Sequence, residues 1–141
     1  MIRGRAAELG FTIALPPANG RVYNTFDAHR LLHWAGLEGR AVELKRALLR
    51  AYHAAGRNPS APDVLVELAA GVGLDPARAK SIVESDEFTQ EVRNKERYWL
   101  ELGVGGVPFV LLNDKYAIEG AQSPDTFAQA LREVAAMTGA R

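Results

Sequence analysis

The side chains that most often carry chemistry are sparse in this sequence. His29 and His33 lie four residues apart, so both imidazoles would face the same side of a helix and could reach one metal ion. No glutamate stands next to His29 as in a His-Glu-x-x-His motif, and no third ligand follows at a suitable spacing. We find no Ser-His-Asp arrangement, phosphate-binding glycine loop or paired-carboxylate signature either. We therefore predict neither a metal site nor a hydrolase site.

Cysteine is absent from all 141 residues. This excludes disulfide bonds, thiolate zinc sites and a cysteine nucleophile within this chain. Neither redox compartment is excluded, because a cysteine-free chain is stable in both.

The overall charge is balanced, with 17 basic and 17 acidic residues. A neutral chain gives no electrostatic reason to bind nucleic acid or an anionic membrane. No apolar run approaches the roughly 20 residues that span a bilayer. Residues 1–9 contain arginines without a hydrophobic signal-peptide core, so we expect the cytoplasm as the location.

Periodicity and turn residues predict a helical block, then a β-hairpin, then a last helix. Residues 1–9 resemble a helix end, with Gly10 as its terminator, followed by an extended piece at 11–15 and a turn at 16–20. The expected later helices begin near Asn24 or Thr25, Ala41, Pro62, Pro76, Ser85 and Pro124. We expect Phe88 and Trp99 to lie on the helix that opens at Ser85, as core anchors.

Residues 107–112 form a continuous apolar run of strand length, and residues 116–119 can return beside it. A strand that is apolar on both faces suits the centre of a sheet. A hairpin with one helix is marginally stable, and an unpaired apolar strand is an association hazard. The pattern thus predicts a neighbouring strand that these residues do not supply.

Five segments in chain order carry a family resemblance. The stretch from Gly103 to Phe109 is similar to the cis-proline loop of thioredoxin-like proteins, with Pro108 as the cis residue. The other segments resemble the FrnE-like branch of the DsbA family: Asn24–Leu31, Arg50–His53 with Gly56–Asn58, Gly73–Asp75, and Tyr116–Pro124. The match extends from about residue 6 to 135, and five collinear segments are far more specific than one.

The resemblance implies an α/β fold: an incomplete thioredoxin-like domain, formed by a β-hairpin and the C-terminal helix, with a large all-helical insertion. It divides the chain into a remnant of the thioredoxin-like domain and linker at 1–20, the helical insertion at 21–103 and the ββα part at 104–141. The first strand, the Cys-x-x-Cys helix and the following strand of the family have no counterpart. We expect a truncated chain rather than a cysteine-free remnant, because a drifting central strand would be expected to become more polar.

The resemblance also indicates substrate-contact residues. Val107 and Pro108, with Gly106 before them, would dock an extended thiol or disulfide substrate through the backbone; alternatively, Pro108 only shapes the strand entrance. Gln122 lies in the corner that holds the γ-glutamyl carboxylate of glutathione in related isomerases; alternatively, Ser123 in this corner is simply an N-cap. Asn24 and Arg30 could face the cleft, or Asn24 could cap a turn.

Three functions follow as hypotheses. The first is a thiol–disulfide oxidoreductase or isomerase of DsbA type, inactive as this cysteine-free chain and requiring no cofactor. The second is a protein similar to 2-hydroxychromene-2-carboxylate isomerase, with glutathione as its cofactor. The third is a non-catalytic module that binds a peptide or forms a homodimer through strand 107–112.

Overall fold

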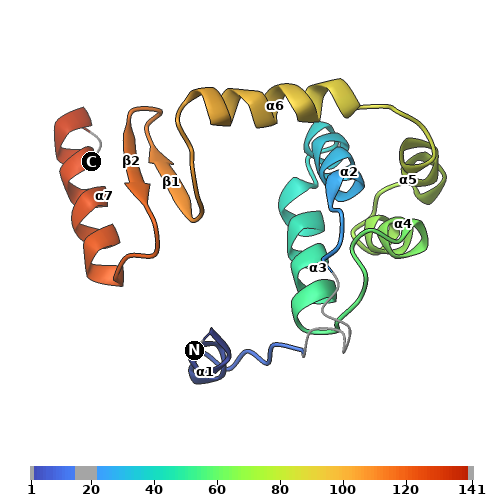
Figure 1. The fold of residues 1–141 in the computed structure, drawn as a ribbon, viewed down its shortest axis with the longest axis horizontal. Coiled ribbons are helices and arrows are strands. Elements are labelled where there is room, and N and C mark those ends of the chain that lie inside the picture. Colours follow the sequence, from blue (N-terminus) through green and yellow to red (C-terminus); the bar gives the residue numbers. More distant parts are fainter. Residues whose placement is uncertain (1, 15–21, 140–141) are drawn as a thin grey trace. The chain divides into compact units, whose positions relative to one another are not determined.

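The computed structural model describes residues 2–14 and 22–139 (Figure 1). They form α1 Ile2–Glu8, α2 Phe26–Leu37, α3 Ala41–His53, α4 Pro62–Gly71, α5 Pro76–Val83, α6 Thr89–Glu101, β1 Phe109–Leu112, β2 Tyr116–Glu119 and α7 Pro124–Thr138. The chain separates into two compact units, Met1–Asn94 and Lys95–Arg141, with the boundary inside α6. The order of helical block, hairpin and last helix is the predicted one.

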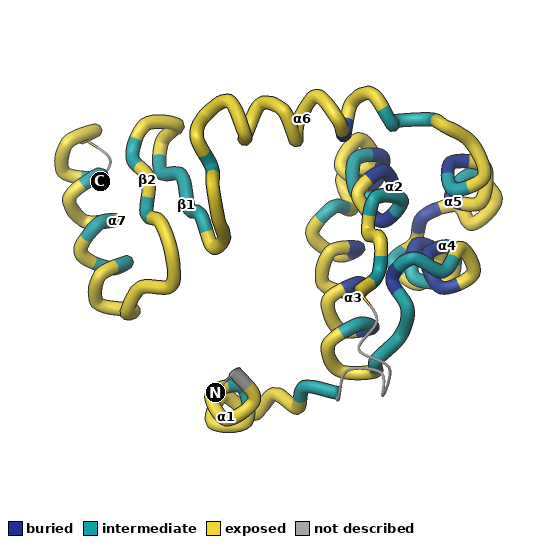
Figure 2. Tube along the Cα trace, viewed as in Figure 1, coloured by how far each residue is buried: buried dark blue, intermediate teal, exposed yellow. Residues whose placement is uncertain are grey.

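The first unit has its core among α2, α3, α4 and α5, where the buried positions of Figure 2 concentrate. Each of these helices contributes one large side chain that is fully buried: Leu31, Leu44, Leu65 and Ile82. Burying a side chain of this size stabilises the folded state by about 1.5–3 kcal/mol. The helical block therefore has a hydrophobic core of its own.

Local signals fix most helix ends as the sequence predicts. Pro62 and Pro76 occupy the first turns of α4 and α5, and the Asp75 carboxylate accepts a hydrogen bond from the Ala77 amide at 2.9 Å. Gly10 and Gly103 end their helices with φ of +74° and +85°, as expected of left-handed terminators. Residues 11–14 have no regular secondary structure, although the Ala14 amide donates to the His53 carbonyl at 2.6 Å. The turn predicted at 16–20 lies outside the described residues.

A buried cation joins α2 to the end of α5. The Arg30 side chain is 4% exposed, and its guanidinium donates to the carbonyls of Ile82 and Ser85 at 2.7 Å and of Glu87 at 2.9 Å. It also pairs with the Asp27 carboxylate at 2.8 Å, which compensates its charge. The last carbonyls of a helix lack intrahelical hydrogen-bond donors and carry partial negative charge. A guanidinium supplies both N–H donors and a positive charge there.

The last long helix begins later than predicted. α6 starts at Thr89, not at Ser85, because the carbonyls of Ser85 and Glu87 point to Arg30. Phe88 is therefore not on the helix: it has a positive φ of 62°, and its ring packs against His33 at a centroid distance of 5.1 Å, beside the core. The prediction of Trp99 as a core anchor is wrong. Trp99 is 41% exposed, whereas the buried residue of α6 is Val92, seven positions earlier.

The second unit is built on an antiparallel hairpin. β1 pairs with β2 in the register Phe109 with Glu119 through Leu112 with Tyr116. Asn113 and Asp114 have positive φ of 50° and 54°, and the Lys115 amide donates to the Leu112 carbonyl at 3.2 Å within the three-residue turn between Leu112 and Tyr116. Every described residue of this unit is half-buried or exposed. Unlike the helical block, the hairpin and α7 have no fully buried core.

The Arg30 arrangement predicts a large loss on substitution. Arg30→Met removes the guanidinium donor to the part-buried carbonyls of Ser85 and Glu87 and the cation paired with Asp27, so we expect the free energy of unfolding to fall by about 2–4 kcal/mol. Arg46→Met, an exposed arginine on α3, should change it by less than about 0.5 kcal/mol. Urea denaturation followed by circular dichroism measures both. A loss at Arg30 no greater than at Arg46 contradicts the structural role.

The loop that Arg30 organises also carries an ion pair with a pH signature. The Arg78 guanidinium donates to the Glu87 carboxylate at 2.6 Å, and this hydrogen bond lowers the pKa of Glu87 below its ordinary 4.5. A carboxylate with a lowered folded-state pKa stabilises the fold above its unfolded pKa and loses that effect as pH falls through the folded value. We therefore expect Glu87→Gln to destabilise the protein near pH 7, with the difference from the unsubstituted protein shrinking as pH falls below the ordinary 4.5 and vanishing only below the lowered folded-state pKa. Denaturation curves over this range test it, with the exposed Glu101→Gln as control; a difference independent of pH is the contrary result.

Candidate substrate-docking site

The loop between α6 and β1 is open and rich in glycine. A side chain placed on Gly105 or Gly106 would meet no described atom within 4 Å. A hollow of about 240 Å³ lies against this loop and against Phe109 and the end of β2. Space here is therefore available for another chain to approach the backbone closely.

Val107 and Pro108 form the end of this loop. The bond between them is cis, as the resemblance implies. The Pro108 carbonyl accepts a hydrogen bond from the Gly120 amide at 2.9 Å, which extends the hairpin by one pair. Val107 is 89% exposed. The proline is thus anchored to the hairpin while the residue before it faces outward.

The other edge of β1 has no strand beside it among the described residues, where the sheet is β1 and β2 alone. Backbone groups of successive strand residues point to opposite edges. Because Pro108 bonds towards β2, the amide and carbonyl groups of Phe109 and Leu111 point to the unoccupied edge. Edges of this kind accept a further strand.

The corner before α7 is already internally bonded. The Ser123 hydroxyl accepts from the Thr126 amide at 3.2 Å, so the N-cap interpretation of Ser123 is confirmed. The Gln122 side chain donates to the Glu119 carbonyl at 3.0 Å. Asp125 adds an acidic group to the first turn of α7. This arrangement favours a structural corner over a carboxylate-binding one.

The two predicted site residues in the helical block also have local roles. The Asn24 carboxamide accepts from the Phe26 amide at 2.9 Å, which confirms the alternative that Asn24 caps a turn. Arg30 is buried and bonded to carbonyls as described above, which favours a structural role over substrate contact. The structure thus brings Gly106, Val107 and Pro108 together in one exposed loop and uses Asn24 and Arg30 inside the first unit.

Sequence reasoning missed the part that β2 contributes to the hollow. Glu119 and Gly120 line it beside Phe109, because the register of the hairpin places Glu119 opposite that residue. The signal was present in the lengths of the two strands and the turn, which together fix the register.

Within residues 2–14 and 22–139, no three His, Cys, Asp or Glu side chains gather in a way that could hold a metal ion. None of the helices in these ranges is long and apolar enough to cross a bilayer.

A helical block, a cis-proline loop, a hairpin and a last helix, in this order, are consistent with a thioredoxin-like protein with a helical insertion. The sequence matches the family described as DSBA-like thioredoxin domain over residues 1–132, and the chain therefore belongs to that family. The fold class expected from the sequence is confirmed.

Two proteins show the family relationship in detail. The structure is similar to that of a probable DsbA oxidoreductase from Streptomyces coelicolor, with a TM-score of 0.79 and 34% identity over 99% of this chain and 58% of the other. The sequence is 27% identical to the uncharacterized protein YwbO of Bacillus subtilis over 133 residues, 94% of this chain and 66% of YwbO. The chain thus spans less than two thirds of the length of both relatives.

Proposed function

We propose that this chain is the substrate-docking part of a FrnE-like thiol–disulfide oxidoreductase or isomerase, and that it cannot exchange thiols by itself. The observation that carries the proposal is the loop in which Val107 is exposed beside Pro108, at the open end of an apolar strand. Membership of the DSBA-like family supports the reaction class.

Docking would use backbone recognition. An extended peptide that runs past Gly106 and Val107 could form main-chain hydrogen bonds to the loop, as an added strand does. The free space beside Gly105 and Gly106 allows such an approach. Main-chain bonds read no particular side chain, so the substrate class is an extended peptide or small molecule that carries a thiol or disulfide.

The redox step needs a thiolate from outside these 141 residues. Thiol–disulfide exchange proceeds by attack of a thiolate on a disulfide sulfur, and this sequence contains no cysteine. The open edge of β1 would accept the strand that precedes a redox helix, because its apolar residues Phe109, Val110 and Leu111 remain half-buried rather than covered.

Two alternatives have their own discriminating measurements. Saturable binding of glutathione in calorimetry would favour the isomerase-like reading, in which Gln122 contacts the peptide carboxylate. A concentration-dependent dimer in sedimentation would favour pairing of the strand at 107–112 with a second copy. The occupied hydrogen bonds of the 120–123 corner argue against the first, and the open edge of β1 supports the second.

The absence of a thiolate predicts no reductase activity. In the insulin-reduction assay with dithiothreitol, this chain should give the same rate of turbidity as buffer, while an intact DsbA-type oxidoreductase raises it. Activity above the buffer rate that survives repurification would refute the proposed inactivity.

Backbone docking predicts a specific pattern of substitution effects. Val107→Pro removes an amide donor, whereas Val107→Ala keeps it, so we expect the first to weaken binding of a short peptide with an S-methylated cysteine by about tenfold relative to the second. Backbone-amide NMR titration measures the affinity and should show the largest shifts at residues 104–107. Equal affinities of the two variants, with both folded by circular dichroism, would contradict docking at this loop.

A further inference from the structure

A second hollow lies in the helical block, away from the candidate docking loop in sequence. It measures about 380 Å³ and is lined by α2, α3 and the residues just before and after them. Sites for small molecules have volumes of about 300–1,000 Å³ and are mostly apolar with a few polar groups. The size of this cavity therefore fits a small ligand.

The floor of the cavity is apolar and rigid. Ala28 and Leu32 come from α2, and Leu48 comes from α3. Ala28 and Leu48 are buried, 5% and 7% exposed, and Ala28, Leu48 and Leu32 all belong to or pack against the hydrophobic core of the block. A surface held by the core keeps its shape without a ligand, which reduces the entropy lost on binding.

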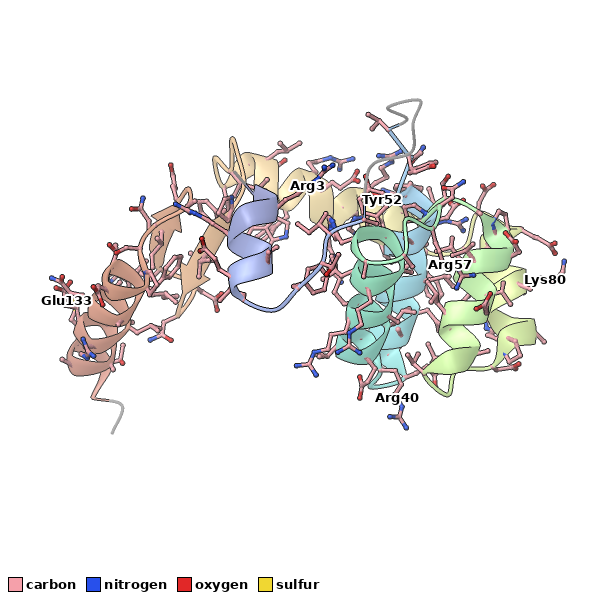
Figure 3. All side chains as sticks on the ribbon, turned by 90° about the horizontal axis from the view of Figure 1, so that it is seen from below. Arg3, Arg40, Tyr52, Arg57, Lys80 and Glu133 are labelled. Atoms are coloured by element: carbon pink, nitrogen blue, oxygen red, sulfur yellow. The ribbon has the colours of Figure 1, made fainter. Side chains whose placement is uncertain are left out.

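Aromatic rings stand at one side. Tyr23 and Tyr52 meet edge to face at a centroid distance of 6.3 Å, and Tyr52 meets His53 in the same manner at 4.8 Å. Tyr52 is at the end of α3 opposite to Arg40 (Figure 3). Such rings favour a planar aromatic guest, which can continue the edge-to-face or offset contacts.

Basic side chains, and no acidic ones, line the cavity among the described residues. These side chains are those of Lys45, His29 and His53. Lys45 is exposed and takes part in none of the described ion pairs. An ammonium group at the edge of an apolar cavity attracts an anion, and a carboxylate can accept its hydrogen bonds.

We propose that the cavity between α2 and α3 binds a small aromatic carboxylate. The ring system lies on Ala28 and Leu48 beside Tyr52, and the carboxylate pairs with Lys45. This binding needs no thiol and no redox step, so it goes beyond the docking function proposed above and is independent of it.

The probe for this site is 2-naphthoate, with 2-naphthalenemethanol as its uncharged match. Titration of the full chain, followed by ligand fluorescence, should give saturable binding of the carboxylate that is about tenfold tighter than that of the alcohol. Lys45→Met keeps the unbranched apolar part of the side chain and removes the ammonium group. It should weaken naphthoate binding to the level of the alcohol and leave the alcohol unaffected.

Two further variants locate the site. Arg46→Met removes the neighbouring charge on α3, which does not line the cavity, and should change naphthoate affinity less than about twofold. Thr25→Trp fills the mouth from a position whose side chain makes no cap hydrogen bond, and should abolish binding of both probes. Circular dichroism confirms that each variant is folded.

Three outcomes would overturn the proposal: no saturable binding, equal affinity for the carboxylate and the alcohol, or equal effects of the Lys45 and Arg46 substitutions. If Thr25→Trp prevents folding, amide NMR shifts of the unsubstituted chain replace it. Shifts centred on residues 25–32 and 45–53 support the site, and shifts elsewhere refute it.

Discussion

The hydrogen bonds of the Arg30 guanidinium hold α2 to the end of α5 and to the residues just before α6. This one side chain donates hydrogen bonds to the carbonyls of residues that are 52 to 57 positions away in the sequence, including a carbonyl at the end of α5. Within the described part of the chain, no buried side-chain nitrogen or oxygen lacks a partner, so the cost of burying this charge is met by hydrogen bonds and by Asp27. The same bonds direct the carbonyls of Ser85 and Glu87 away from the axis of the next helix, and α6 consequently begins at Thr89.

The two units differ in what holds them together. The helical block encloses fully buried leucine and isoleucine side chains from four helices, whereas the hairpin and α7 contain no fully buried residue among those described. β1 nevertheless has only apolar side chains. An apolar strand with an open edge exposes both unpaired backbone groups and hydrophobic surface. A further strand would pair the backbone groups and cover part of that surface. The hairpin therefore depends on an added neighbour in a way that the helical block does not.

Features set by neighbouring residues were predictable from the sequence, and features set by distant contacts were not. Pro76 in the first turn of α5 and Ser123 as the N-cap of α7 act within a few residues, so these helix starts were predicted correctly. The cis-proline loop was found through its resemblance to a family, since Gly-Val-Pro alone is a weak signal. Arg30 gives no local indication that its partners lie beyond residue 80, and for that reason its burial and the late start of α6 were missed. Helical spacing likewise predicted that Trp99 faces the core. Spacing shows which residues lie on the same face of a helix, but not how far along the helix the core extends.

Recognition of an extended substrate and redox chemistry have different structural requirements. Exchange requires a thiolate, whereas docking of an extended substrate requires an accessible backbone, an open strand end and space for a second chain. The loop at Gly106–Pro108 has these three features without any cysteine. The cavity between α2 and α3 has other requirements, since its shape and one positive charge would suffice to bind an aromatic anion. Because these properties reside in backbone geometry and helix packing, none of them requires a thiol.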